Sequence, residues 1–161
     1  MSIKRRYHAR KALLRQLSTE LQNKFGKSFS ELIMRDVEIV ELDDGRQVIL
    51  SDGRPIVIRA KEGIFPTLAT LDRVSLKRVV VDMGAVPHVA NGADVMAPGV
   101  TVADGDISPG EEVMVVDERN AKPLAIGLAL VPGSAMRAPK GRVVKNLHHV
   151  GDEIWSLSKR A

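Results

Sequence analysis

The segment that decides the fold of this chain is VVVDMGAVPHVANGADVMAPGV, which runs from Val79 to Val100. It begins with an apolar run that ends in Asp82, as expected of a buried strand that stops at a turn. Residues 85–91 then fit about two turns of helix, and Gly92 follows as a left-handed cap. The Pro-Gly pair at 98–99 indicates a turn. We therefore expect a strand, a short helix and a turn in quick succession.

This segment carries little reactive chemistry. It has no cysteine and no lysine that would complete a phosphate-binding loop, and its glycines do not form the dinucleotide-binding fingerprint. A helix start instead offers unpaired backbone N–H groups to an anion, and glycine lets a ligand approach the backbone closely. A groove of this kind beside a basic rim suits a nucleotide phosphate or an unstacked base. The same glycines also fit plain turns and caps, so both interpretations stay open on this pattern alone.

The composition argues against several classes of function. The 161 residues suffice for one ordinary domain or two small ones, and they include no cysteine. Disulfides, thiolate metal sites and cysteine nucleophiles are therefore excluded. The adjacent His148 and His149 are poor partners for one metal, because neighbours in an extended segment point to opposite faces. No apolar run reaches the ~20 residues of a membrane span. We expect no catalytic residue, metal, cofactor or membrane contact, and a cytoplasmic location.

The distribution of charge is more informative than its sum of +4. Residues 1–30 carry eight bases and one acid, and residues 119–161 carry eight bases and two acids. Acids dominate 31–50, with six against two bases, and 103–118, with six against none. If the basic ends meet in the fold, they form one positive field that suits a polyanion such as nucleic acid. Solvated surface charge explains the same composition equally well.

The first half begins with a predicted helix. Leucines recur every four residues from Leu13 and end at Phe25, and Gly26 supplies a stop signal. We expect basic residues, including Arg5, Arg6 and Arg10, near the start of the opposite face. Ser28 and Glu31 have the spacing of a capping box, which predicts a short second helix through Met34.

Extended segments with turn signals follow. Residues 37–42, 46–50 and 55–60 alternate as strands, and Asp-Gly turns separate them, which predicts a meander. The segment 63–73 is expected to contain a short helix that begins at Pro66. In the second half we expect further strands at 77–82, 112–118, 124–131 and 153–157. Many short strands with one inserted helix predict a compact barrel.

The second half strongly resembles a PUA domain, the RNA-binding module named after pseudouridine synthases and archaeosine transglycosylases. The resemblance is carried by residues 79–100, by LAIGLALV at 124–131 and by GRVVKNLHHVGDEIW at 141–155. In that family a strand is followed by a short helix after Asp-x-Gly-Ala, and then by a Pro-Gly-Val turn. The order of the motifs matches as well as the motifs themselves.

The first half is similar to the pre-PUA domain of the malignant T-cell-amplified sequence family, which also includes translation machinery-associated proteins and the N-terminal part of ligatin. The segment GIFPTL at 63–68 carries this likeness, and the ending from Asn146 to Trp155 resembles the family's closing pattern. The cysteine-free composition resembles that of the stand-alone archaeal members. The implied fold class is α+β, with a pre-PUA α/β domain at 1–76 and a mostly β PUA pseudo-barrel at 77–161.

The resemblance also implies which residues contact RNA. By position these residues surround the helix, its end and the following turn. Met96 and Val100 could instead be core residues, and of the two Met96 fits a core position better. Charge alone adds bases from both halves. The expected RNA-binding residues are Gly84, Ala85, His88, Asn91, Gly92, Ala93, Met96, Pro98, Gly99, Val100, Lys77, Arg78, Arg142, Lys145, Arg5, Arg6 and Arg10.

The implied function is non-catalytic RNA binding in translation, with a tRNA acceptor end and small-subunit rRNA as ligands. Eukaryotic family members act with a density-regulated partner in initiation, reinitiation and recycling, which makes such a translation factor a candidate partner here. One alternative is an accessory subunit that presents RNA to a tRNA or rRNA modification enzyme. Another, of a different class, is a protein-interaction module that binds a translation factor.

Overall fold

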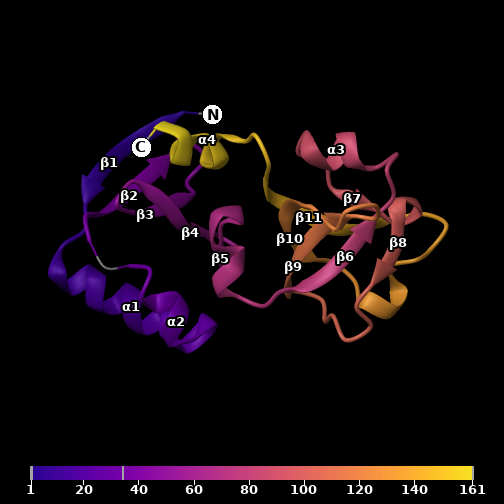
Figure 1. Ribbon diagram of the computed structural model, residues 1–161, viewed down its shortest axis with the longest axis horizontal. Helices are drawn as coiled ribbons and strands as arrows, with labels where there is room; N and C mark the ends of the chain where they lie inside the picture. The colour runs from indigo at the N-terminus through magenta and orange to yellow at the C-terminus, as the bar shows by residue number, and fades with distance from the viewer. Residues whose placement is uncertain (1, 34, 161) are drawn as a thin grey trace. The chain divides into compact units, whose positions relative to one another are not determined.

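The computed structural model describes residues 2–33 and 35–160, and it shows an α+β chain of two compact units (Figure 1). The first unit contains the residues up to Ser75 together with those from Glu153 onward, and the second contains Leu76–Asp152. The predicted fold class is confirmed. None of the helices in the described residues is long and apolar enough to cross a membrane.

The first unit is built on a five-stranded antiparallel sheet whose strands lie in chain order. The acidic turns predicted from Asp-Gly pairs join β2, β3 and β4, so the expected meander is confirmed. The helices α1 and α2 follow β1, and a 3-10 segment, η1, ends the meander. The elements are β1 (Ile3–His8), α1 (Lys11–Phe25), α2 (Lys27–Ser30), β2 (Val37–Leu42), β3 (Gln47–Ser51), β4 (Arg54–Ala60), β5 (Gly63–Pro66) and η1 (Leu68–Arg73).

Both faces of this sheet are apolar, because β2, β3 and β4 contain consecutive apolar residues and successive side chains of a strand point to opposite faces. Ile39 and Val57 pack with Leu17 of α1 on one face. Val40 and Ile58 pack on the other face, against the C-terminal helix α4 (Glu153–Arg160). Figure 1 shows α1 and α2 on one side of the sheet and α4 on the opposite side. The near-continuous apolar runs of β2–β4 follow from this double cover.

Four local predictions for this unit were wrong. Pro66 does not begin a helix, because it pairs with Val57 as the last residue of β5, and the 3-10 segment η1 begins at Leu68. Residues 3–8 form the edge strand β1, paired with β2, and not the start of the first helix. The N-cap of α2 is Gly26, with no side-chain cap, so the capping box does not form, and the predicted end at Met34 lies outside the described residues. Residues 153–157 are helical because Ile154 and Leu157, three residues apart, both bury against the first sheet. This segment belongs to the domain expected at 77–161, but the structure groups residues from Glu153 onward with the first unit.

The second unit is a six-stranded sheet in the order β7-β11-β10-β9-β6-β8. β6 and β9 are parallel, and the other neighbours are antiparallel. Val79, Val115 and Ala125, from three adjacent strands, are fully buried in its core. Its elements are β6 (Lys77–Val81), α3 (Val86–Ala90), β7 (Val95–Met96), η2 (Ala97–Gly99), β8 (Val100–Ala103), β9 (Glu112–Asp117), β10 (Pro123–Ala129), η3 (Gly133–Ala135) and β11 (Arg142–His149).

Candidate nucleic-acid interface

The segment after β6 is fixed at the start of α3. The Asp82 side chain accepts a hydrogen bond from the backbone N–H of Ala85 at 2.8 Å, and the Asp82 N–H donates to the carbonyl of Gly99 at 2.9 Å. A Cβ on Gly99 would lie only 3.0 Å from the Cβ of Ala85. The turn therefore packs directly on the helix start, and the predicted order of strand, helix and turn is confirmed.

Asn146 of β11 holds the other end of α3. Its side-chain amide donates to the carbonyls of Val89 at 3.1 Å and Ala93 at 3.0 Å. Its backbone N–H donates to Asp94 at 2.8 Å. These bonds satisfy carbonyls that a helix end leaves without intrahelical partners, so the loop after α3 is anchored to the sheet. In the sequence, Asn146 stands out only as part of the resemblance to the family's closing pattern.

The cap of α3 also packs closely on the sheet. Gly92 has a φ of 98°, as predicted for a left-handed cap, and a Cβ there would lie 3.0 Å from the Nε2 of His149. His149 donates from Nδ1 to its neighbour's carbonyl. His148 is buried, and its Nδ1 lies 2.8 Å from Asp152. Both histidines thus have structural partners, and they do not share a ligand site.

Most of the predicted residues of this segment reach the surface. Val100 is buried, with 6 % of its surface exposed, so it is a core residue. Met96 is 50 % exposed, so the expectation that it is a core residue was wrong. It lies on the short edge strand β7, where only one neighbour covers it. The other predicted residues are partly buried (Ala85, Gly92, Gly99) or exposed (Gly84, His88, Asn91, Ala93, Pro98).

A basic loop borders this surface. Arg142 pairs in register with Met96, and its guanidinium donates to Asp94 at 3.0 Å. The N–H of Ala97 donates to the carbonyl of Gly141 at 2.8 Å, which ties the loop between η3 and β11 to the turn. Side chains of the turn and of this loop line one shallow hollow, formed by Ala97, Pro98, Val100, Arg137, Ala138 and Pro139.

Arg137 and Lys140 of this loop were missed by the sequence analysis. Both are exposed, and neither forms an ion pair with any residue whose side chain the structure describes, in 2–33 or 35–157. With Arg142 they form what we call the basic loop, residues 137–142. The run RAPKGR was visible in the sequence, but only the hydrogen bond to Ala97 shows that it lies beside the turn.

Other predicted bases lie elsewhere. Lys77 and Arg78 begin β6, whereas Gly84 follows its far end, and a strand of this length spans about 16 Å. The Lys77 ammonium lies 2.9 Å from Glu111, whose hydrogen bond raises the lysine pKa. Lys145 is half-buried on β11. The structure therefore places Arg142 beside the turn, and Lys77 and Arg78 at the other end of β6.

The predicted bases of the first unit are partly neutralised. Arg5 lies 2.8 Å from Glu41, and Arg6 donates to both oxygens of Glu38, at 2.7 and 3.0 Å. These hydrogen bonds lower the pKa of both glutamates. Arg10 is exposed and occupies the N-cap position of α1, where its side chain makes no capping hydrogen bond. One surface shared by the basic ends of the chain stays a prediction.

One group of possible metal ligands occurs in the described residues, where ligand atoms of His8, Asp36 and Glu38 lie within 4.8 Å of one another. The His8 Nε2 is 2.9 Å from Asp36, and both Glu38 oxygens already accept from Arg6. Because His8 is far in sequence from Asp36 and Glu38, the group could not be recognised as a short motif. His8 and Asp36 are exposed and Glu38 is partly buried, and these pairs account for the group.

Comparison with known proteins supports the resemblance. Residues 77–151 match the family model of the PUA domain. An uncharacterized protein of Methanocaldococcus jannaschii is 41 % identical over 98 % of this chain and 99 % of its own length. Translation machinery-associated protein 20 of Saccharomyces cerevisiae is 27 % identical over 94 % of this chain and 93 % of its own length.

Solved structures agree with this result. A hypothetical protein of Pyrococcus horikoshii superimposes with a TM-score of 0.73 at 36 % identity, over 96 % of this chain and 99 % of the other. A PUA domain protein of Aeropyrum pernix has a TM-score of 0.75 at 29 % identity, over 96 % and 91 %. The chain belongs to the family of PUA-domain proteins that includes these archaeal proteins and the translation machinery-associated and malignant T-cell-amplified sequence proteins.

Proposed function

We propose that this protein is a non-catalytic RNA-binding protein that acts in translation, in the cytoplasm. The second unit is its RNA-binding domain, and the first is a pre-PUA domain. The observation that carries the proposal is one surface on which the partly exposed, backbone-rich segment 84–98 borders Arg137 and Lys140, two cations without an acid partner among the described residues. The family's translation-associated members support the cellular role.

The mechanism follows from the chemistry of the surface. Cations of the basic loop neutralise phosphates of the RNA backbone and release counterions, which supplies affinity without sequence preference. The turn and the ends of α3 present small side chains and backbone, which favour recognition of shape and of unstacked terminal nucleotides. The ligands that fit this arrangement are a tRNA acceptor end and small-subunit rRNA.

The test is binding of deacylated tRNA, with and without its terminal CCA, at two salt concentrations. Gly99 is unsuitable for a blocking substitution because even a Cβ would crowd Ala85. Met96→Glu is better, because the side chain is 50 % exposed on the proposed surface. Val102→Glu is the matched control, since Val102 is 55 % exposed on β8.

We expect Met96→Glu to weaken tRNA binding about tenfold, because it places a negative charge beside the bound phosphates. Val102→Glu should change the affinity by less than about threefold. Loss of CCA should weaken binding by the wild type more than binding by Met96→Glu. Equal effects of the two variants would contradict the proposed surface. Binding insensitive to CCA would contradict the acceptor end as ligand and leave RNA binding itself standing.

A further inference from the structure

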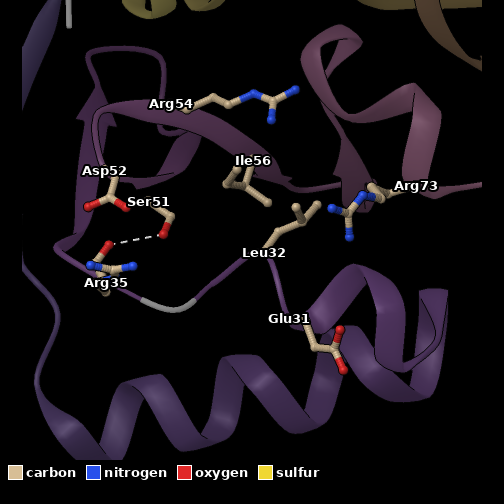
Figure 2. A pocket seen from close by; sticks show the side chains of 8 residues that line it. All are labelled: Glu31, Leu32, Arg35, Ser51, Asp52, Arg54, Ile56 and Arg73. Atoms are coloured by element: carbon tan, nitrogen blue, oxygen red, sulfur yellow. Dashed lines mark hydrogen bonds between the residues drawn. The ribbon is translucent and has the colours of Figure 1, made fainter.

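The first unit contains a second basic hollow, far in sequence from the surface just described. It lies between the end of α2, the β3–β4 turn and the end of η1 (Figure 2). Three arginines, two acids and two aliphatic side chains surround it. The lining residues are Glu31, Leu32, Arg35, Ser51, Asp52, Arg54, Ile56 and Arg73.

The backbone positions the three arginines. Arg54 donates to the carbonyl of Ala69, and Arg73 donates weakly to the carbonyl of Ser28 at 3.4 Å. The carbonyl of Arg35 accepts from the hydroxyl of Ser51 at 3.0 Å and from the N–H of Asp52 at 3.1 Å, which fixes the loop that carries it. Each guanidinium has five N–H donors, so most of them remain available to a ligand.

The acids beside these arginines do not neutralise them. Neither Glu31 nor Asp52 forms an ion pair with any of the three within the described residues. Among the described residues, the one acid partner of Arg73 is its neighbour Asp72, at the long distance of 3.9 Å. This arrangement differs from β1, where glutamates pair with Arg5 and Arg6. The hollow therefore keeps a local excess of positive charge and free fork-shaped donors, which suit phosphate.

The floor of the hollow narrows the class of ligand. Figure 2 shows the aliphatic side chain of Ile56 below Arg54 and that of Leu32 beside the guanidinium group of Arg73. None of the described residues that line the hollow is aromatic, so they offer no platform on which a base would stack. Aliphatic surface between cations matches the alternation of sugar and phosphate along a nucleic-acid backbone.

We propose that this hollow, the arginine pocket, is a second RNA contact that binds a backbone phosphate through Arg54 and Arg73, with Arg35 at its edge. The inference rests on the proposed function, because it extends RNA binding from the second unit to the first. A phosphate on a free nucleotide has the same chemistry, and the experiments below separate the two sources.

The first experiment removes the pocket's charge. The variant Arg35→Gln/Arg54→Gln/Arg73→Gln is compared with Lys11→Gln/Arg15→Gln/Lys61→Gln, which removes three exposed charges elsewhere on the first unit. We expect the pocket variant to bind a structured RNA about tenfold more weakly than the control variant, with a shallower salt dependence. Equal affinities of the two variants would overturn the proposal. Thermal unfolding checks both folds, and the single variant Arg35→Gln, which removes no side-chain contact to the described residues, should show part of the loss.

The second experiment observes the arginines directly. The Nε–Hε signals of Arg54 and Arg73 are followed by NMR during titration with single-stranded RNA, with adenosine monophosphate and with a phosphoserine peptide. We expect RNA to shift both signals at concentrations where the other two do not. Signals that ignore RNA, or that respond equally to the nucleotide or the peptide, would overturn an RNA-phosphate site.

Failure of this inference is distinct from failure of the proposed function. If RNA binds and responds to Met96→Glu but not to loss of the arginine pocket, only the further inference is wrong. If RNA does not bind the wild type at all, the proposed function is wrong, and the arginine pocket falls with it.

Discussion

Strand β1 of the first unit and the basic loop of the second are both rich in basic residues, but the bases of β1 are paired with acids, whereas Arg137 and Lys140 of the basic loop have no acid partner among the described residues. On β1, Arg5 and Arg6 face Glu41 and Glu38 on the neighbouring strand at 2.7–2.8 Å. In the basic loop, Arg137 and Lys140 have no acid partner within the described residues. Bases that a sheet has already paired contribute little to a polyanion site, whereas unpaired bases keep their full field.

The contrast teaches that the sequence position of a charge does not decide its role. The N-terminal thirty residues have a larger excess of bases than any other stretch of that length, but cross-strand pairs consume part of it. The basic loop is short, and it lies beside the turn only because Gly141 accepts a hydrogen bond from Ala97. The number of basic residues favours the N-terminal region as the RNA-binding surface, whereas the lack of acid partners among the described residues favours the basic loop.

The largest expected effect comes from reversing the unpaired charges. Arg137→Glu with Lys140→Glu should weaken RNA binding about a hundredfold, because two phosphate contacts are replaced by repulsion. Both side chains are exposed, so the thermal midpoint should not change. Binding is measured by fluorescence anisotropy at fixed salt. An effect below about threefold would contradict an RNA-binding role of the basic loop, since the loop would then contribute no more than scattered surface charge.

A smaller effect, of opposite sign, is expected from releasing the paired charges. Glu38→Gln with Glu41→Gln removes the acids that neutralise Arg6 and Arg5, so RNA affinity should rise about threefold. The same assay measures it at low salt, where surface electrostatics are strongest. Unchanged affinity would show that pairing with Glu38 and Glu41 is not the reason why the arginines of β1 contribute little to RNA binding.

Removing the paired arginines themselves should have less effect still. Arg5→Gln with Arg6→Gln should weaken RNA binding by less than about twofold, because their charge is already compensated. A charge-matched comparison is Arg137→Gln with Lys140→Gln, which should cost about tenfold. If the β1 pair proves as costly as the loop pair, the distinction between paired and unpaired bases fails.

The smallest effect is a dependence on pH. Hydrogen bonds from Arg6 and Arg5 lower the folded-state pKa of Glu38 and Glu41 below the unfolded value of about 4.3. A lowered folded pKa stabilises the fold above the unfolded pKa, and this contribution disappears as the pH falls through the folded value. The stability advantage of the wild type over Glu38→Gln/Glu41→Gln should therefore be present at pH 7, decrease as the pH falls below about 4.3, and be lost once the pH has fallen through the lowered folded-state pKa of both groups. An advantage that persists at pH 2.5, in chemical denaturation, would show that it does not arise from these ionised pairs.

Much of the fold could be predicted from local patterns. Periodicity and turn residues located β2, β3 and β4, and the order of strand, helix and turn from Val79 to Val100 was correct. The failures are segments whose partners lie far away in the sequence. Residues 3–8 become a strand because β2 offers them an edge, and residues 153–160 become a helix because the first sheet has an uncovered apolar face. A five-residue run such as EIWSL fits both periods, so only tertiary packing decides.

The candidate site shows the same division. The residues around α3 follow from a contiguous motif, and all but Val100 reach the surface at least in part. The basic loop and the arginine pocket depend on hydrogen bonds between segments distant in sequence, such as Ala97 to Gly141 and Arg54 to Ala69. Met96 was expected to be buried because it is apolar, and the short edge strand exposes it.

The most direct test of the central claim is the salt dependence of RNA affinity for the wild type, for Arg137→Gln/Lys140→Gln and for Arg5→Gln/Arg6→Gln. Each phosphate contact to single-stranded RNA contributes about 0.7 to the slope of log affinity against log salt concentration. We predict that the loop variant loses about 1.4 from the slope and that the β1 variant keeps the wild-type slope. A reduced slope for the β1 variant, with an unchanged slope for the loop variant, would contradict an RNA-binding surface at the basic loop.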